Sequence, residues 1–303
     1  MELRQLLYVV RIAEEKNFSR AAEKLHIAQP SLSQQLSKLE KEIGVLLFRR
    51  TTNSVELTHA GSVFVAKAQD ILDSVEQLRQ EMDDLAHMRK GRLVVGSLPI
   101  TGAHMLPLVL PVFQEKFPEI EVVLVEDSTS RLEQLTASGQ TDLSLLSLPL
   151  EEPALTYVPL VEEEIRLAVP PQHELARRSG SAEDVRLEEL REQPFILLKK
   201  GQGFRQIALD LCAQAGFAPR IVFESGNIET VQSLVAAGMG IAFVPAMVAR
   251  AQWSTLAPVY VRLAEPRPSR TLVIASRKGR YLSRASEAFI RTMQTTVERH
   301  FDL

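Results

Sequence analysis

The chain has 303 residues, 45% of them hydrophobic and 24% charged, and a formal net charge of −3 at pH 7. A chain of this length has room for two or three compact units, each with its own core. The slightly acidic balance excludes a protein that coats nucleic acid non-specifically, so any DNA site has to be local. Residues 1–58 carry nine Lys and Arg against seven Asp and Glu, so the net charge of this segment is positive, as such a local site needs.

The sequence shows no sign of export, a membrane span or a metal site. An amphipathic pattern begins directly after Met1, without the basic and then apolar segments of a secretory signal. The most apolar stretch, residues 105–113, contains Pro107 and Pro111 and is too short to span a bilayer. The histidines are scattered, and the single cysteine, Cys212, excludes an intrachain disulfide. We therefore expect a cytoplasmic protein with a core thiol, no metal and no cofactor.

Two helices are predicted within residues 1–28. Apolar residues recur at helical spacing from Leu3 to Ala13. A second, short helix over residues 20–25 follows Ser19, whose hydroxyl is expected to cap it. Residues 26–28 then form a tight break.

A third helix is predicted to begin at Gln29, where Pro30 suits the first turn because its missing N–H is not needed there. Its apolar stripe consists of Leu32, Leu36, Leu39 and Ile43. The other side carries amides, hydroxyls and an ammonium group, which suit base edges and phosphates in a major groove. These side chains belong to Gln29, Ser31, Ser33, Gln34, Ser37 and Lys38. The alternative is an ordinary solvated face; the short helix and tight turn before it favour DNA binding.

A hairpin is predicted after Gly44. Residues 46–57 suggest two short strands joined by a turn at residues 52–54, with Arg49 and Arg50 on the first arm. An isolated arginine pair means little, but beside a reading helix it is suited to holding phosphates.

The same segment resembles the N-terminal signature of LysR-type transcriptional regulators. The matching positions are Ala21, Ala22, Leu25, Ile27, Gln29 to Ser33, Gln35, Leu36, Leu39, Glu40, Glu42 to Gly44, Leu47, Phe48 and Arg50. In that family the third helix reads the major groove and the wing touches the DNA backbone. The resemblance implies DNA-binding roles for Gln29, Pro30, Ser31, Ser33, Gln34, Lys38, Arg49 and Arg50. Gln34 replaces an arginine that many relatives carry.

A long helix capped by Thr58 is predicted to run to about Met88. Its apolar residues alternate four and three apart, as in a coiled coil, while polar residues fill most other positions. The stripe consists of Phe64, Ala68, Ile71, Val75, Leu78, Met82 and Leu85. A narrow stripe favours dimerisation over the alternative, a helix lying on its own domain, and a twofold dimer would present two reading helices to an inverted repeat.

Beyond Gly91, strand and helix patterns alternate, which predicts α/β units with a mainly parallel sheet. The first series has strands at 92–96, 121–126 and 142–147 and helices at 105–117 and 130–138. A second has strands at 165–169, 195–198, 221–223 and 241–244 and helices at 204–215 and 228–237. A strand at 270–275 and a helix at 283–300 complete the chain.

The predicted fold is thus an α/β sensor of two Rossmann-like lobes, preceded by an all-α winged helix-turn-helix and a long linker helix. The expected boundaries are 1–58, 59–90 and 91–303. Segments 173–176 and 236–245 resemble the family's sensor domain, so that the resemblance covers the whole chain. It implies that the last strand and helix return to the first lobe, giving lobe I at 91–161 and 268–303, lobe II at 162–267, and hinge crossings near 161–163 and 264–269. Such a hinge resembles that of periplasmic binding proteins.

Gly238 and Gly240 are separated by one residue, as in a phosphate-binding loop. They follow a helix and precede a strand, however, which is the reverse of a dinucleotide fingerprint. We interpret them as a helix C-terminus and turn.

A ligand is expected between the lobes, where strand ends and helix N-termini converge. The candidate effector-binding residues are Ile100, Thr101, Ser128, Thr129, Gly203, Phe204, Arg205, Asn227 and Ile228. Arg205 is the strong cation among them and, with Thr101 and Ser128, suits a carboxylate, so the expected co-inducer is a small organic anion. Helix capping is an equal alternative for each hydroxyl. Ile100 stands where relatives commonly have Ser or Thr.

The sequence predicts a regulator, not an enzyme, because no Ser/His/Asp cluster, metal spacing or phosphate loop is evident. The resemblance implies double-stranded promoter DNA, RNA polymerase, a small-molecule effector and a second copy of the chain as partners, with assembly into dimers and often tetramers. No membrane partner is expected. The alternative function is a cytoplasmic two-lobed small-molecule-binding protein without sequence-specific DNA activity.

Overall fold

The chain forms two compact units, Met1–His87 and Met88–Leu303, in a computed structural model. The structure describes residues 1–50, 55–86, 91–180, 183–250 and 257–300. Each unit is described by itself below. No described helix is both long and apolar enough to cross a membrane.

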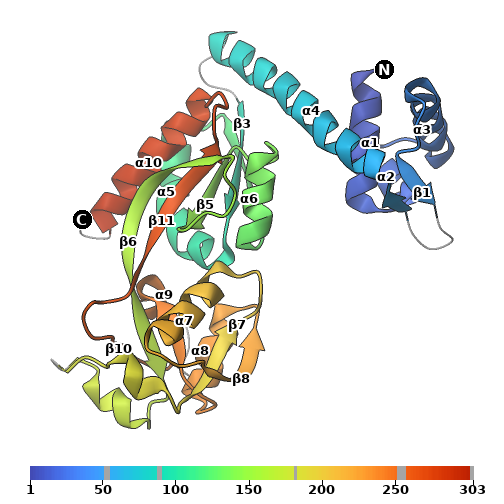
Figure 1. The fold of residues 1–303 in the computed structure, drawn as a ribbon. Coiled ribbons are helices and arrows are strands. Elements are labelled where there is room, and N and C mark those ends of the chain that lie inside the picture. Colours follow the sequence, from blue (N-terminus) through green and yellow to red (C-terminus); the bar gives the residue numbers. More distant parts are fainter. Residues whose placement is uncertain (51–54, 87–90, 181–182, 251–256, 301–303) are drawn as a thin grey trace. The chain divides into compact units, whose positions relative to one another are not determined.

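The N-terminal unit is a helix-turn-helix followed by a two-stranded wing and a long helix (Figure 1). Its elements are α1 (Leu3–Glu15), α2 (Phe18–Lys24), α3 (Gln29–Ile43), β1 (Phe48–Arg50), β2 (Val55–Leu57) and α4 (His59–Ala86). Its core joins Val9 and Ile12 of α1 with Leu32, Leu36 and Leu39 of α3, all almost fully buried. The predicted wing turn at residues 52–54 lies outside the described residues.

The caps of these helices follow the expected chemistry, with one correction. Asn17, not Ser19, caps α2: its backbone is extended and its side chain accepts the amide of Arg20 at 3.0 Å. Ser19 already lies inside the first turn, so its hydroxyl cannot take that position. Thr58 caps α4 as predicted, since its Oγ1 accepts the amide of Gly61 at 2.9 Å.

Lobe I combines parallel and antiparallel strands. Its elements are β3 (Gly91–Ser97), α5 (Pro99–Lys116), β4 (Ile120–Glu126), α6 (Thr129–Ala137), β5 (Leu143–Ser147), β11 (Ser269–Arg277) and α10 (Arg284–His300). Strands β5, β3 and β4 are parallel, whereas β11 pairs antiparallel with β5 and with β6 (Leu155–Val169). Strands β4, β3, β5 and β6 therefore run in one direction, as predicted for a mainly parallel sheet, and the returning C-terminal strand β11 enters antiparallel between β5 and β6.

Helix α5 begins earlier than predicted. It starts at Pro99 and continues through Pro107 and Pro111, so Ile100 and Thr101 lie in its first turn instead of in a loop. Pro99 suits that first turn, and the apolar face that includes Met105 and Phe113 stabilises the helix despite the internal prolines.

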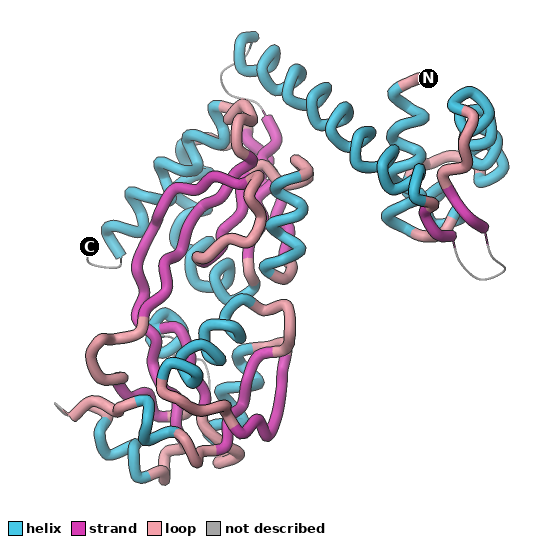
Figure 2. The backbone as a smooth tube through the Cα atoms, viewed as in Figure 1, coloured by secondary structure: helices cyan, strands magenta, loops and turns pink. Residues whose placement is uncertain are grey.

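Lobe II contains the remaining elements (Figure 2). These are short 3-10 helices at Glu174–Arg178 and Leu187–Leu190, β7 (Pro194–Leu198), α7 (Gly203–Gln214), β8 (Arg220–Ser225), α8 (Ile228–Ala236), β9 (Ala242–Pro245), α9 (Ala246–Arg250) and β10 (Val259–Arg262). The sequence did not predict α9 or β10. Gly238 has a φ of 87° directly after α8, which confirms that this glycine ends a helix.

Strand β6 runs through both lobes. Its first part pairs with β11 of lobe I, and its last part pairs with β9 and β10 of lobe II. The first crossing, predicted near residues 161–163, is thus the middle of a continuous strand. A hydrogen-bonded strand bends less easily than a loop, so the segment of β6 between the lobes has little freedom to bend.

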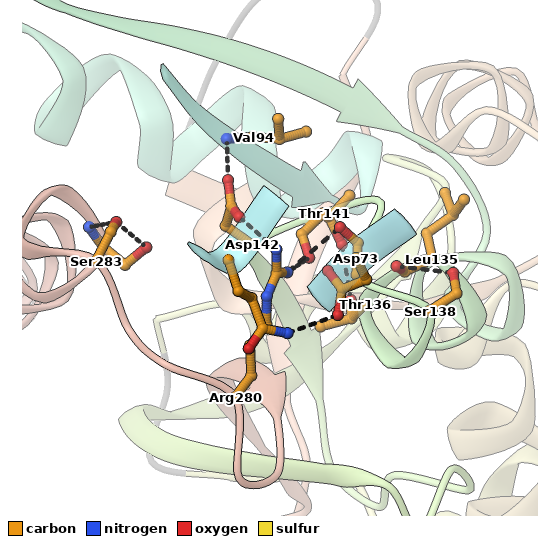
Figure 3. A network of polar contacts seen from close by, with 12 residues as sticks. Asp73, Val94, Leu135, Thr136, Ser138, Thr141, Asp142, Arg280 and Ser283 are labelled. Atoms are coloured by element: carbon orange, nitrogen blue, oxygen red, sulfur yellow. Dashed lines mark hydrogen bonds and ion pairs between the residues drawn. The ribbon is translucent and has the colours of Figure 1, made fainter. Parts of the chain in front are cut away.

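A polar cluster ties the C-terminal segment to the sheet of lobe I (Figure 3). Asp142 Oδ2 accepts the amide of Val94 at 2.8 Å, and Asp142 Oδ1 lies 3.3 Å from Arg280 Nη2. Arg280 Nη1 donates to the carbonyls of Gly139 and Thr141, both at 3.3 Å. These contacts hold the end of β11, the turn after α6 and strand β3 together.

Candidate functional site

Helix α3 separates an apolar from a polar side as predicted. Leu32, Leu36 and Leu39 are buried in the core of the N-terminal unit. The other side is exposed at Gln29, Pro30, Ser31, Gln34 and Lys38, while Ser33 is half-buried. The helix therefore presents amides and an ammonium group to whatever approaches it.

Glu40 of α3 fixes the start of the wing, and the sequence did not predict this. Its Oε1 accepts the amide of Leu47 at 2.7 Å and that of Phe48 at 3.3 Å. Both amides follow the turn after Gly44, whose φ is 76°. One carboxylate thus positions the first wing strand against the polar helix. In the sequence, Glu40 was recognisable only as one position of the matched signature, and nothing there indicated which groups it bonds.

The wing places Arg49 in an exposed position opposite Glu56. The side chain of Arg50 lies outside the described residues. Arg49 and Lys38 are therefore the two exposed cations that the structure describes among the predicted DNA-binding residues.

The predicted apolar stripe of α4 divides into two parts. Ala68 is buried against Leu6 and Val10 of α1, with Phe64 packed beside them. Further along, Ile71, Leu78 and Met82 are exposed by 40%, 57% and 47%. Val75 is half-buried, and the side chain of Leu85 lies outside the described residues. The first part thus belongs to the unit's own core, as in the alternative interpretation, and the exposed part remains available to a partner.

Two pockets lie between the lobes. The first, here called the mixed-charge pocket, has a volume of about 420 Å³. Its lining comes from Thr129, Ser130, Glu133, Ser147, Leu148, Pro149 and Glu151 of lobe I and from residues 200–203, 205–207, 209 and 210 of lobe II. The second, here called the acidic pocket, has a volume of about 450 Å³. Its lining comes from Pro99, Ile100, Ala103, His104 and Glu126 of lobe I and Gln202, Gly226, Asn227, Ile228, Glu229, Gln232 and Val248 of lobe II.

A hydrogen bond joins the lobes beside the mixed-charge pocket. The amide of Gly203, at the N-terminus of α7, donates to Thr129 Oγ1, at the N-terminus of α6, at 3.0 Å. A Cβ on Gly203 would lie 2.7 Å from that same oxygen, so a larger residue here would require the Thr129 side chain to move. Gln202, next to this bond, lines both pockets.

Arg205 lines the mixed-charge pocket but already has partners. Its Nη1 lies 2.6 Å from Glu224 Oε1 and donates to the carbonyl of Leu198 at 2.6 Å. A carboxylate ligand would have to share this guanidinium with Glu224. That is a weaker anion site than an unpaired arginine would make.

The structure brings the other predicted effector-binding residues together only in part. Ile100 and Ile228 line the acidic pocket, as does Asn227, whose Oδ1 caps α8 by accepting the amides of Glu229 and Thr230 at 2.7 and 3.4 Å. The remaining three, Thr101, Ser128 and Phe204, are not among the residues that line either pocket. Asn227 thus caps a helix, a role considered from the sequence only for the hydroxyls.

Sequence reasoning missed a buried ion pair where the chain crosses between the lobes. Glu163 of β6 and Arg270 of β11 are each 4% exposed and lie opposite each other in the strand register. Phe204 packs its ring against the Arg270 guanidinium, 5.3 Å from the ring centroid. A charged residue in a strand pattern gives no hint of a partner 107 residues away.

The single cysteine is buried in α7, and burial raises the pKa of the Cys212 thiol to about 11. Little thiolate is therefore present at neutral pH, which makes this thiol unreactive.

Comparisons with known proteins agree on one family. Residues 3–62 match the profile of the "Bacterial regulatory helix-turn-helix protein, lysR family", and residues 86–298 match the "LysR substrate binding domain". The "Uncharacterized HTH-type transcriptional regulator YcgK" of Bacillus subtilis is 40% identical, with 100% of this chain and 97% of the relative covered. The "DNA-binding transcriptional dual regulator OxyR" of Escherichia coli is 33% identical, with 100% and 98% covered.

Solved structures agree with the sequence relatives. A full-length OxyR variant from Pseudomonas aeruginosa superposes with a TM-score of 0.75 at 28% identity, covering 98% of this chain and 95% of that one. Full-length CbnR in complex with its target DNA superposes with a TM-score of 0.67 at 25% identity, covering 98% and 100%.

Proposed function

Because this chain belongs to the LysR family of bacterial transcriptional regulators, we propose that it binds an inverted-repeat promoter site as a homodimer or homotetramer, under the control of a small molecule bound between its lobes. The observation that carries the proposal is the exposed polar side of α3, directly opposite its buried leucines.

The polar side of α3 divides by chemistry into base-reading and phosphate-holding groups. The exposed amides of Gln29 and Gln34 can each donate and accept a hydrogen bond at a base edge. Lys38 on α3 and Arg49 on the wing carry positive charge, which phosphates attract without regard to sequence. In this proposal Glu40 sets the distance between the two groups, since it holds the wing against α3.

Residues 1–58 carry nine Lys and Arg against seven Asp and Glu, so one copy of this unit has little net positive charge and is expected to bind DNA weakly. Two copies joined through the exposed apolar part of α4 would present two reading helices to one inverted repeat, which combines their affinities. We extend the proposal to cytoplasmic localisation, to tetramers and to contact with RNA polymerase, as is general for such regulators.

Control is assigned to the interlobe cleft. A ligand between the lobes can alter DNA binding only if its affinity differs between two arrangements of the lobes or subunits. The bond between Gly203 and Thr129 is one contact that such a ligand would alter, because it joins the lobes at the edge of the mixed-charge pocket.

We do not extend a peroxide response to this chain, although relatives bear the name "Hydrogen peroxide-inducible genes activator". A disulfide within one chain needs two cysteines, and this chain has one. That one is buried, and its pKa of about 11 leaves little thiolate to react with an oxidant.

A gel-shift with the DNA upstream of the chain's own gene tests the proposal. Gln29→Ala and Gln34→Ala should each weaken binding to the specific site about tenfold, with little change on unrelated DNA, because a good base contact contributes roughly 1–3 kcal/mol of discrimination. Gln134→Ala, which removes an exposed amide from α6, is the matched control and should bind normally. Equal affinity for all DNA sequences in the unchanged protein would overturn the proposal and favour a two-lobed small-molecule-binding protein.

A further inference from the structure

The sequence predicts a small organic anion as the effector, but the acidic pocket is itself negatively charged. Its two carboxylates come from opposite lobes: Glu126 ends β4 of lobe I, and Glu229 lies in the first turn of α8 of lobe II. Neither has a hydrogen bond or ion pair to another described residue through its carboxylate. No lysine or arginine is among the described residues that line this pocket. Two unneutralised carboxylates attract a cation and repel an anion.

A histidine in the same pocket adds a second acceptor. His104 Nδ1 lies 2.9 Å from the carbonyl oxygen of Ile100, which can only accept, so Nδ1 carries the proton in this arrangement. In the neutral ring Nε2 is then an acceptor. This Nε2 is buried and has no hydrogen-bond partner among the described residues. Its lone pair adds to the negative potential beside the pocket, although the atom has almost no accessible surface for a ligand to contact.

The N-terminus of α8 does not offset this negative character. Its first amides would ordinarily attract an anion, but those of Glu229 and Thr230 already donate to Asn227 Oδ1. The remaining walls include the apolar side chains of Ile100, Ala103, Ile228 and Val248. The pocket thus combines two carboxylates and the carboxamides of Gln202, Asn227 and Gln232 with apolar walls, in a volume that suits a small organic molecule.

We propose that the acidic pocket binds a small organic cation, an amine or guanidinium carried on an apolar body. The charged group lies between Glu126 and Glu229, while the body lies against Ile100 and Ile228. Because the two carboxylates belong to different lobes, the cation favours the arrangement that brings the lobes together. This assignment rests on the proposed function for its regulatory meaning, but the binding itself does not depend on DNA.

The test compares three probes of the same size that differ in charge: benzylamine, benzyl alcohol and benzoate. Isothermal titration of the full chain at low salt should give an affinity for benzylamine at least about fivefold above that for the alcohol, with benzoate weakest. Glu126→Gln and Glu229→Gln should each weaken benzylamine binding about twofold to fivefold, as expected for exposed charge pairs, and high salt should reduce the difference.

Two variants serve as matched controls. Glu121→Gln removes the same charge from the exposed part of β4, and Glu151→Gln removes it from the mixed-charge pocket. Both should bind benzylamine as the unchanged protein does. Absence of benzylamine binding at about 10 mM, equal or tighter binding of benzoate, or insensitivity to both pocket variants would each overturn the proposal.

A gel-shift on the same preparations separates this result from the proposed function. Selective benzylamine binding without any DNA shift would support the proposed cation site and contradict the proposed DNA-binding function. A specific DNA shift together with any of the titration results that contradict the cation site would support the DNA-binding function and exclude the cation site.

Discussion

Arg270 lies directly opposite Glu163 where β11 pairs with β6, and its Nε and Nη2 approach the same carboxylate oxygen at 2.8 and 2.7 Å. The other oxygen, Glu163 Oε1, accepts the amide of Met247 at the start of α9 at 2.6 Å. One buried carboxylate therefore ties both crossing strands to a helix of lobe II. This arrangement gives the crossing a defined geometry in place of a loose hinge.

Breaking this pair should destabilise the second unit strongly. Arg270→Met leaves the Glu163 charge buried without its counter-ion, which typically costs about 3 to 5 kcal/mol. Urea unfolding followed by circular dichroism measures the loss. The double variant with Glu163→Met should recover part of it, because both charges are then removed. As a control, Glu287→Gln breaks the exposed pair with Arg291 and should cost less than about 0.5 kcal/mol. A small loss for Arg270→Met alone would mean that the pair contributes little.

Removal of the Glu40 carboxylate should loosen the wing. Glu40→Ala leaves the amides of Leu47 and Phe48 without an acceptor, a loss of about 1 to 3 kcal/mol for the N-terminal unit. DNA affinity should fall as well, since Arg49 follows these residues directly. Glu40→Gln keeps an acceptor oxygen and is the control: it should retain most of the stability and affinity. Equal losses in both variants would indicate that the charge, not the hydrogen bonds, is what matters.

Local pattern was enough to predict most elements of this fold. The 3.6-residue spacing of Leu32, Leu36 and Leu39 defined α3, and the same spacing defined α4. Short buried strands such as β5 were evident as apolar runs between turn residues. The start of α5 was missed because Pro99 and Gly102 are typical of a loop, whereas Pro99 occupies the first turn of the helix.

Contacts between distant segments were not predictable from pattern. Glu163 and Arg270 are separated by 107 positions, and nothing near either one indicates the other. Arg205 was predicted to bind a ligand carboxylate because no nearby residue identified Glu224 as its partner. The charge of a pocket is the sum over residues from several elements, so it emerges only once those elements are placed together.

The bond between the lobes at Thr129 should control how far the cleft opens. Thr129→Val removes the acceptor for the Gly203 amide while keeping nearly the same shape. Hydrogen exchange at the start of α7 should then be faster, and Thr129→Ser, which keeps the hydroxyl, should exchange as slowly as the unchanged protein. Gly203→Ala should act like the valine change, because its Cβ would lie 2.7 Å from Thr129 Oγ1. Unchanged exchange in Thr129→Val would show that other contacts hold the lobes.

Charge introduced into the exposed part of α4 should separate the proposed dimer. Leu78→Glu or Met82→Glu places a carboxylate on each copy at positions that are 57% and 47% exposed in the single chain. Burying these two like charges in a shared interface is unfavourable, so the variants should elute as monomers in size-exclusion chromatography with light scattering. Glu76→Lys changes the charge of an exposed position off the stripe and should leave the dimer intact. A persistent dimer in both stripe variants would place the interface elsewhere.

Stability at neutral pH should rise relative to the unchanged protein when Glu133 is replaced by glutamine. Burial raises the pKa of this carboxyl above its ordinary value of 4.5, although the amides of Glu151 and Glu152, which donate to its Oε2 at 3.0 and 2.8 Å, lower that pKa in part. The folded state therefore holds its proton at a pH where the unfolded chain has already lost it, and the contribution of this group to the free energy of unfolding falls as pH rises through that range. Glutamine has no proton to lose, and its carbonyl oxygen can still accept both amides. The free energy of unfolding is measured with urea at pH 4 and pH 7. Relative to that of the unchanged protein, the value for Glu133→Gln should increase as the pH rises. Glu121→Gln, at an exposed position on β4, should show no such shift. A shift in the opposite direction would mean that the two backbone donors outweigh burial and hold the pKa of Glu133 below its ordinary value.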